Sequence, residues 1–159
     1  MEFGFSKELD LLREMYKKFA ETEIKPLAEE LDEEERFPVE SIPKLARYGF
    51  MGIPFPKEYG GAGGNYLTYA MAIEELGKVC GTTAVVVSAH TSLCAGPIYY
   101  FGTEEQKQKY LVPLAKGEKV GAFGLTEPSA GTDSSMQQTT AKLDGDEYVL
   151  NGTKVFITN

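Results

Sequence analysis

The hydrophobic periodicity of the chain changes near Gly117, and this change limits the fold more than any other feature of the sequence. Before that residue, apolar side chains recur every three or four positions, which is the spacing of amphipathic helices. After it, short segments rich in β-branched and aromatic residues alternate with turn residues, which is typical of strands. We therefore predict an α+β fold, with an all-α helical domain over residues 1–119 and the start of a β-sheet or barrel domain over residues 120–159.

The N-terminal part is predicted to be a series of helices. The first spans residues 6–31 and should kink near Pro26, because proline has no N–H group to donate within a helix. Asn65 and Thr103 stand where N-caps of two later helices are expected, the second within the capping box "TEEQ". The segment "IPFPKEYGGAGG" is predicted to be a loop, because its glycines and prolines do not support regular structure.

Between Lys78 and Glu104 no residue carries a formal charge, and this segment is long enough to cross a bilayer. Threonine, serine, histidine, glycine and proline interrupt it, however, so a helix in the middle of a bundle is favoured over a membrane span. His90, the one histidine of the sequence, lies in this segment. We expect it to be a hydrogen-bonded interior residue rather than a catalyst acting alone.

Four strands are predicted after Gly117, in the segments "KVGAFGLT", "TTAKL", "EYVL" and "KVFIT". Turns that contain Asp144-Gly145 and Asn151-Gly152 would join the last three of them. A sheet of this size needs something to cover its apolar face, and its last strand would expose an unpaired edge. We therefore expect an incomplete β domain, cut from a longer polypeptide.

The charge balance excludes some classes of partner. The chain has 24 acidic and 16 basic residues, a formal net charge of −8, which disfavours nucleic acid because phosphates require a basic surface. Two cysteines and one histidine match no metal-site spacing, so we expect reduced thiols, an intracellular protein and no metal. The N-terminal "MEFGFSKELD" lacks the features of a signal peptide, which predicts a cytoplasmic protein, or a processed mitochondrial matrix protein in a eukaryote.

Two threonines, Thr126 and Thr158, each stand at the C-terminal end of a predicted apolar strand. Such strand ends would place hydroxyl and N–H groups beside apolar side chains, which suits a flat heteroaromatic ring. The segment "SAGTDSS" that follows offers small donors for phosphate oxygens. A ring joined to a pyrophosphate describes a flavin dinucleotide, although by spacing alone such a segment is more often a surface turn.

Longer stretches carry a family resemblance. "GLTEPSAGTDSSMQQTTA" and "YVLNGTKVFITN" resemble the two flavin-contact motifs of the acyl-CoA dehydrogenase family. The resemblance continues through "FPVESIPKLARYGFMGIPFPKEYGGAG" and "FGTEEQKQKYLVPLAKGE", so it covers essentially the whole chain, and its wording is most similar to the short-chain, butyryl-CoA branch. It implies an N-terminal helical domain and the opening strands of a middle β domain, without the family's C-terminal four-helix bundle.

The resemblance also implies which residues bind FAD and substrate. Thr132 would lie by the pyrophosphate and also touch the CoA thioester ligand, and Leu93 would line the acyl pocket. Glu127 would have a structural or ligand-orienting role, because the family's catalytic glutamate belongs to the C-terminal domain. The residues that would contact the cofactor are Phe123, Leu125, Thr126, Gly131, Thr132, Phe156, Ile157 and Thr158.

The activity implied by the resemblance is α,β-dehydrogenation of short-chain acyl-CoA thioesters, of the butyryl-CoA to crotonyl-CoA type. Electrons would pass to an electron-transferring flavoprotein, and the full-length protein would be a homotetramer. This chain would be an incomplete and inactive portion of such an enzyme. Two alternatives stay open: a non-catalytic truncated paralogue that acts as an interaction or CoA-ligand module, and an oxygen-using acyl-CoA oxidase or flavin monooxygenase of the same fold.

Overall fold

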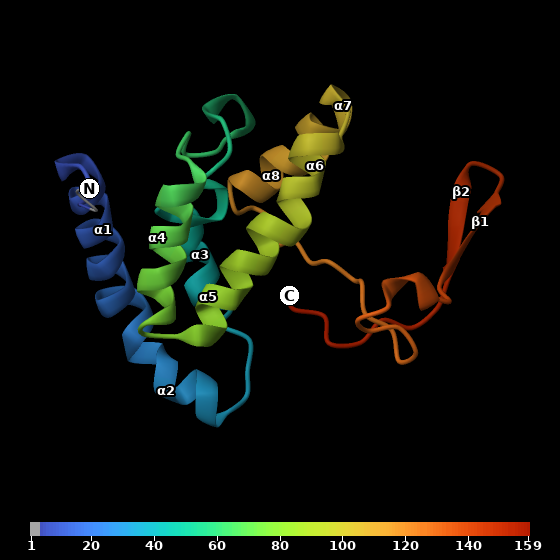
Figure 1. The fold of residues 1–159 in the computed structure, drawn as a ribbon, viewed down its shortest axis with the longest axis horizontal. Coiled ribbons are helices and arrows are strands. Elements are labelled where there is room, and N and C mark those ends of the chain that lie inside the picture. Colours follow the sequence, from blue (N-terminus) through green and yellow to red (C-terminus); the bar gives the residue numbers. More distant parts are fainter. Residues whose placement is uncertain (1–3) are drawn as a thin grey trace.

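The computed structural model describes residues 4–159, so the first three residues of the predicted helical domain lie outside the described range. The described residues form a helical body from which a β-hairpin projects (Figure 1), which confirms the predicted α+β class. The elements are α1 (Lys7–Phe19), α2 (Lys25–Glu33), α3 (Ser41–Arg47), α4 (Tyr66–Gly77), α5 (Gly81–Ser88), α6 (Gly96–Phe101), α7 (Glu104–Gln106), α8 (Val112–Ala115), β1 (Thr140–Asp144) and β2 (Glu147–Asn151).

The first helical stretch has the predicted extent and the predicted irregularity. Ser6 caps α1 by accepting the N–H of Leu9 at 3.3 Å. A π-helical turn, Ala20–Ile24, separates α1 from α2, and Pro26 lies in the first turn of α2. Because proline cannot donate and its ring crowds the preceding turn, the helix departs from α geometry just before it.

The predicted helix ends are confirmed by their hydrogen bonds. Asn65 and Thr68 form a capping box at the start of α4, with the two reciprocal bonds both 3.0 Å long. Thr103 and Gln106 form the same arrangement at the start of α7. Gly49 follows α3 with a φ of +76°, a left-handed conformation that favours glycine at a helix C-terminus. These local signals needed no tertiary context.

Aromatic side chains organise the core between α1, α4 and the loop after α3. The ring of Phe50 packs against those of Phe19 and Tyr16, with centroid separations of 4.5 and 5.3 Å. A second cluster forms around Phe55, Leu111 and Leu114. The predicted loop over residues 53–64 packs closely there, so that a side chain on Gly61 would collide with the carbonyl group of Phe55.

The uncharged segment forms a nearly continuous helix through α5, the π-helical segment Ala89–Ala95 and α6. Val87, His90 and Ala95 are fully buried in it, which confirms the prediction of an interior helix. Within residues 4–159, no helix combines the length and apolar character needed to cross a membrane.

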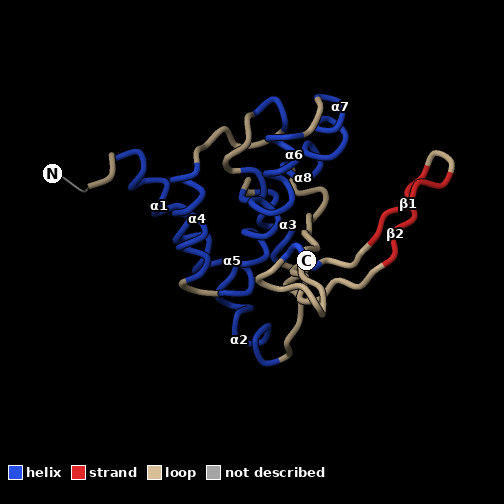
Figure 2. The backbone as a smooth tube through the Cα atoms, turned by 45° about the vertical axis from the view of Figure 1, so that its right-hand side comes forward, coloured by secondary structure: helices blue, strands red, loops and turns tan. Residues whose placement is uncertain are grey.

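The prediction of four strands is wrong for the first and the last. β1 and β2 pair antiparallel across the two-residue loop Gly145-Asp146, and every residue of both strands is exposed. Figure 2 shows this hairpin extending away from the helices. Segments 119–126 and 154–158 are not strands, because a strand requires a neighbouring ladder. They share one backbone hydrogen bond, from Val155 N–H to the Thr126 carbonyl oxygen at 2.9 Å.

The predicted turn at Asn151-Gly152 likewise does not join two strands. β2 ends at Asn151, and the chain then returns to the helical body (Figure 1). Gly152 packs so closely on Thr139 that any larger residue there would collide with it. Thr139 and Gly152 thus lie side by side just beyond the last paired residues, Thr140 and Asn151. Within the described residues, the sheet contains only β1 and β2.

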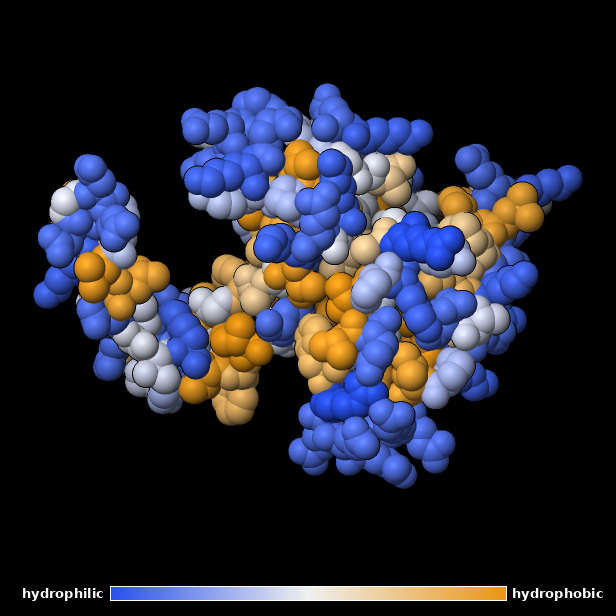
Figure 3. Space-filling model, turned by 180° about the vertical axis from the view of Figure 1, so that it is seen from behind, coloured by the Kyte–Doolittle hydropathy of each residue, from blue (hydrophilic) through white to orange (hydrophobic). Residues whose placement is uncertain are grey.

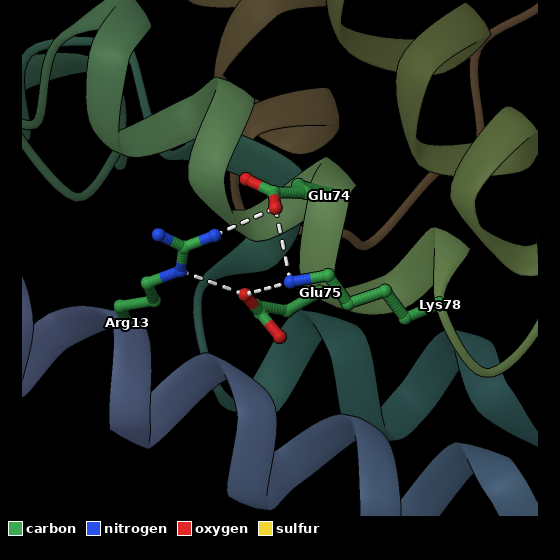
Figure 4. Close-up of polar contacts among 4 residues, drawn as sticks. All are labelled: Arg13, Glu74, Glu75 and Lys78. Carbon is green, nitrogen blue, oxygen red and sulfur yellow. Dashed lines mark hydrogen bonds and ion pairs between the residues drawn. The ribbon is translucent and has the colours of Figure 1, made fainter.

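A charged cluster joins α1 to α4 (Figure 4). The Glu75 carboxylate, 4% exposed, accepts from Arg13 Nε at 2.9 Å and from Lys78 Nζ at 2.7 Å. Burial works to raise the pKa of Glu75, but the hydrogen bonds from Lys78 and Arg13 outweigh it and lower the pKa. Glu74 contacts the same two cations from a half-exposed position. The buried carboxylate therefore fixes α1 against α4.

We expect Glu75→Gln to lower the free energy of unfolding by about 1–3 kcal/mol, because one buried charge-assisted acceptor is lost. The matched control is Glu74→Gln, which removes a half-exposed partner of the same cations and should cost less than about 1 kcal/mol. Urea unfolding followed by circular dichroism measures both values. Equal losses for the two variants would show that burial of Glu75 does not decide its contribution.

Candidate functional site

The two motif segments meet against the uncharged helix and enclose a pocket of about 210 Å³. Residues 120–159, which include the hairpin, are called the arm. Seen from behind, apolar residues gather on the surface where the arm meets the helical body (Figure 3). Seven of the predicted site residues come together in this pocket, although segments 119–126 and 154–158 are not strands. The lining residues are Ala89, Leu93, Phe123, Leu125, Thr126, Phe156, Ile157 and Thr158.

Lys154 fixes the second motif segment to the first. Its Nζ donates to the carbonyl oxygen of Leu125 at 2.9 Å and to Glu127 Oε1 at 2.8 Å. The backbone bond between Val155 and Thr126 lies next to these contacts. Polar contacts therefore hold the two walls of the pocket together, although both segments were predicted to be strands.

Glu127 completes this connection from a buried position, with 5% of its surface exposed. Besides Lys154, its carboxylate accepts the backbone N–H groups of Gln138 at 2.6 Å and Thr139 at 3.1 Å. The hydrogen bond from Lys154, followed by those from Thr139 and Gln138, lowers the pKa of Glu127 to about 2. A carboxylate so fully occupied is a poor general base, which supports the predicted structural role.

Phe156 stands out by its backbone and its exposure. Its φ is +58°, a left-handed conformation that costs a bulky residue about 1–3 kcal/mol, and 94% of its surface is exposed. Phe123 and Leu125 on the opposite wall are also more than two-fifths exposed. Apolar side chains held open to solvent around one pocket are typical of a ligand site.

The pocket also offers unpaired hydroxyl groups. Thr126 and Thr158 are half-buried, and within residues 4–159 their hydroxyls form no side-chain hydrogen bond. Each can donate and accept, so together they suit a ligand edge that carries both ring nitrogens and carbonyl oxygens. The mixture of apolar walls and free hydroxyls fits the ring of a flavin.

Two predicted site residues lie outside this pocket. Gly131 and Thr132 are exposed on the loop that follows Glu127, where Asp133 accepts the N–H of Ser135 at 3.1 Å. A side chain added to Gly131 would meet no atom within 4 Å. Their assignment to a pyrophosphate and a CoA ligand therefore stays a prediction.

Sequence reasoning missed three residues of the site: Ala89, Lys154 and Asn159. Ala89 lines the pocket one helical turn from Leu93, and helical spacing from Leu93 was the available signal. Lys154 and Asn159 lie within the second motif but had no assigned role. Asn159 Nδ2 donates to the carbonyl oxygens of Val86 at 3.0 Å and Gly121 at 2.9 Å. No local pattern in the sequence predicts these partners.

A second, wider pocket of about 570 Å³ borders the first, sharing Ile157 and Thr158 with it. It extends toward the loop after α2, where Arg36 is already engaged by Glu30, Glu34 and Glu40. Within the described residues, no group of three or more histidine, cysteine, aspartate or glutamate side chains could hold a metal ion. Most of the predicted flavin-contact residues line the smaller pocket, whereas the wider one shares only Ile157 and Thr158 with it.

Comparison with known proteins matches two family models to the chain. Residues 6–118 match "Acyl-CoA dehydrogenase, N-terminal domain", and residues 122–159 match "Acyl-CoA dehydrogenase, middle domain". The short-chain specific acyl-CoA dehydrogenase of Clostridium acetobutylicum is 66% identical over the whole chain, which covers 42% of that relative. The acryloyl-CoA reductase (NADH) of Anaerotignum propionicum is 47% identical, with 99% of this chain and 40% of the relative covered.

Solved structures agree with these matches. Butyryl-CoA dehydrogenase from Megasphaera elsdenii superposes with a TM-score of 0.91 at 45% identity, over 99% of this chain and 42% of that chain. An acyl-CoA dehydrogenase from Bacillus anthracis, complexed with FAD, gives 0.89 at 38% identity, over 98% of this chain and 27% of that chain. The chain thus spans less than half the length of the proteins it matches.

Replacement of Glu127 tests its role in joining the pocket walls. We expect Glu127→Gln to speed amide exchange at Gln138 and Thr139 about tenfold at neutral pH, because a neutral amide is a weaker acceptor. The folded-state pKa is depressed, so the stabilisation is present above about pH 4.5 and is lost as pH falls toward about 2. The difference between variant and wild type, measured by NMR exchange, should shrink over that interval.

The matched control for this measurement is Asp146→Asn, at the exposed tip of the hairpin. It removes an acidic charge without touching the contacts of Glu127, so exchange at Gln138 and Thr139 should stay unchanged. A pH-independent difference for Glu127→Gln would contradict the assigned ionised state.

Proposed function

The chain belongs to the acyl-CoA dehydrogenase family, and on this premise we propose that it forms the N-terminal part of a flavin-dependent enzyme for short-chain acyl-CoA thioesters. The single observation that carries the proposal is the pocket in which both motif segments meet, with apolar walls and the hydroxyls of two half-buried threonines. We also propose the domain division at residues 119 and 120. The identity to a short-chain specific dehydrogenase supports the substrate class.

The proposed cofactor is FAD, which supplies a two-electron acceptor for the hydride that leaves the β-carbon of the substrate. The side chains of Phe123, Leu125 and Phe156 would bind the apolar part of its ring and exclude water. The hydroxyls of Thr126 and Thr158 would bind the polar edge of the ring. Binding by preformed apolar walls and a few fixed polar groups is the usual design of a cofactor site.

The remaining contacts of the cofactor and substrate are proposed from the family resemblance. Ile157 would flank the ring beside Thr158, and Gly131 and Thr132 would lie by the pyrophosphate. Leu93, which lines the same pocket as Thr126, would contact the acyl chain, and Thr132 would also touch the CoA ligand. An exposed, unobstructed loop at Gly131 leaves room for a large ligand.

Proton abstraction is assigned to a group outside these residues. The residues that line the pocket include no titratable side chain, and Glu127 is occupied by Lys154 and two backbone donors. A base must reach the proton at the α-carbon, so we assign the step to the catalytic glutamate of the family's C-terminal domain. This chain would orient the thioester and keep water from the reacting bonds.

The reverse reaction is a second candidate, favoured by one observation. A relative of 47% identity is named an acryloyl-CoA reductase that uses NADH. Reduction would return a hydride to the β-carbon and a proton to the α-carbon, so the same binding groups would serve both directions. The direction would then depend on the electron partner, which we propose to be an electron-transferring flavoprotein.

The assembly and compartment follow the same reasoning. We propose a homotetramer of the full-length protein, located in the cytoplasm, or in the mitochondrial matrix of a eukaryote. Bacterial and mitochondrial relatives both match the chain over at least 94% of its length. Size-exclusion chromatography with light scattering would determine the oligomeric state.

The activity is tested on the purified full-length protein. We expect a flavin absorption spectrum, reduction of a dye electron acceptor by butyryl-CoA, and much slower reduction by a long-chain acyl-CoA. An assay with NADH, an electron-transferring flavoprotein and crotonyl-CoA measures the reverse direction. A protein that binds no FAD, or that oxidises none of these thioesters and reduces none of their enoyl products, would contradict the proposed function.

Removal of the pocket hydroxyls tests the proposed cofactor contacts. We expect Thr126→Val and Thr158→Val each to weaken FAD binding about 3–10-fold, because each loses one neutral hydrogen bond at constant side-chain volume. Fluorescence titration of the apoprotein with FAD measures the dissociation constant. Thr140→Val on the exposed face of β1 is the matched control, and an equal effect there would exclude a specific role for the two hydroxyls.

A further inference from the structure

Gly121 connects two segments, residues 119–126 and 154–159, to the helical body. These are the motif segments that form the two walls of the pocket. Its N–H donates to Nδ1 of His90 at 2.9 Å, and its carbonyl oxygen accepts from Asn159 Nδ2 at 2.9 Å. The same Asn159 amide donates to the carbonyl oxygen of Val86 on α5 at 3.0 Å. One residue therefore joins the start of the first segment, the end of the second and the uncharged helix.

Gly121 also lies too close to the helix for any side chain. A Cβ atom there would lie 2.6 Å from Cys94 Sγ and 3.2 Å from Leu114 Cδ2. The 2.6 Å separation from Cys94 is closer than real Cβ atoms come to other atoms, so a larger residue would force the segment and the helix apart. The backbone of Gly121 thus packs directly against the side chains of Cys94 and Leu114, and this contact sets the position of the segment.

His90 has one defined state in this arrangement. It is fully buried, and Nδ1 accepts the Gly121 N–H, so the ring proton must be on Nε2. That nitrogen lies 3.2 Å from the carbonyl oxygen of Met51, to which it donates. Burial lowers the pKa of His90 more than its backbone contacts raise it, which keeps the ring neutral.

The place of His90 on its helix connects these contacts to the pocket. It lies in the π-helical segment 89–95, where Ala89 and Leu93 face the pocket. π-helical turns are rare and occur often at functional sites. The ring is directed into the core while its neighbours on the same turn form one wall of the pocket. A bond from that ring to Gly121 therefore sets how far the opposite wall lies from this one.

We propose that His90 is a positioning residue of the flavin pocket, which holds Gly121, and through it both motif segments, at a fixed distance from the helix that carries Ala89 and Leu93. This inference rests on the proposed flavin-binding function of the pocket. It assigns a role to a side chain that is not among the residues lining the pocket.

Two substitutions separate the two hydrogen bonds of the ring. In His90→Asn, the side-chain oxygen can take the position of Nδ1 and accept from Gly121, but the side chain is too short to reach Met51. In His90→Gln, the amide can reach Met51 but leaves the Gly121 N–H without an acceptor. Helix propensity favours glutamine over asparagine, so it opposes the expected result.

The experiment measures both variants and the wild type as full-length proteins. Hydrogen exchange reports the protection of residues 121–126, and FAD titration reports the dissociation constant. For His90→Gln we expect about tenfold faster exchange of the Gly121 amide and about tenfold weaker FAD binding, because a buried donor loses its partner. His90→Asn should stay within about threefold of the wild type in both measurements. Exchange in α1 and α4 should be unchanged in both variants.

The outcomes are distinct. Wild-type behaviour of His90→Gln would overturn the proposal, and so would equal losses in the two variants, since they would show that only the volume of the ring matters. If the wild type binds no FAD, the proposed function fails. In that case faster exchange at Gly121 in His90→Gln alone would still support the anchoring role of His90, and unchanged exchange would overturn it.

Discussion

The shape of the site depends on the hydrogen bonds that the buried carboxylate of Glu127 accepts. A buried charge is stable only when donors surround it, and here three donors converge from two parts of the chain: Lys154 and the N–H groups of Gln138 and Thr139. Because Lys154 also binds the carbonyl oxygen of Leu125, the carboxylate and the ammonium group close a connection between both motif segments. The donors that hold the carboxylate in place also lower its pKa, so it is a weak base.

The helical body and the arm are stabilised by different forces. The body buries aromatic and aliphatic side chains around Phe50 and Phe55, as a small helical domain requires. The hairpin of β1 and β2 buries none of its residues, and an isolated hairpin is at best marginally stable in water. Order in the arm near the pocket therefore depends on a few polar anchors, those at Glu127 and at Gly121. Loss of one anchor affects the site before it affects the fold.

The sequence predicted features that depend on near neighbours. The caps at Asn65 and Thr103, the irregular turn before Pro26 and the interior helix around His90 all follow from patterns within a few residues. The meeting of Thr126 and Thr158 was also predicted, but for a reason that is wrong, since the segments are joined by side chains and one backbone bond rather than by a sheet. Strand propensity indicates that a segment can pair but does not identify its partner. The hydrogen bonds from Lys154 to Glu127 and from the Gly121 N–H to His90 span 27 and 31 positions.

The lining of the pocket is compatible with both kinds of activity for which the relatives are named. Its walls are apolar, its polar groups are neutral hydroxyls, and the Glu127 carboxylate beside it is occupied by Lys154, so these residues can bind and orient a ligand but are poor proton acceptors. Neither binding nor orientation distinguishes the oxidation of a thioester from the reduction of its enoyl product, because both reactions pass through the same transition state. Relatives named as a dehydrogenase and as a reductase share 66% and 47% identity with this chain, and under the proposed function the electron partner would determine the direction. Under the proposed function, the spacing of the pocket walls depends on residues such as His90, which holds Gly121 but does not itself line the pocket.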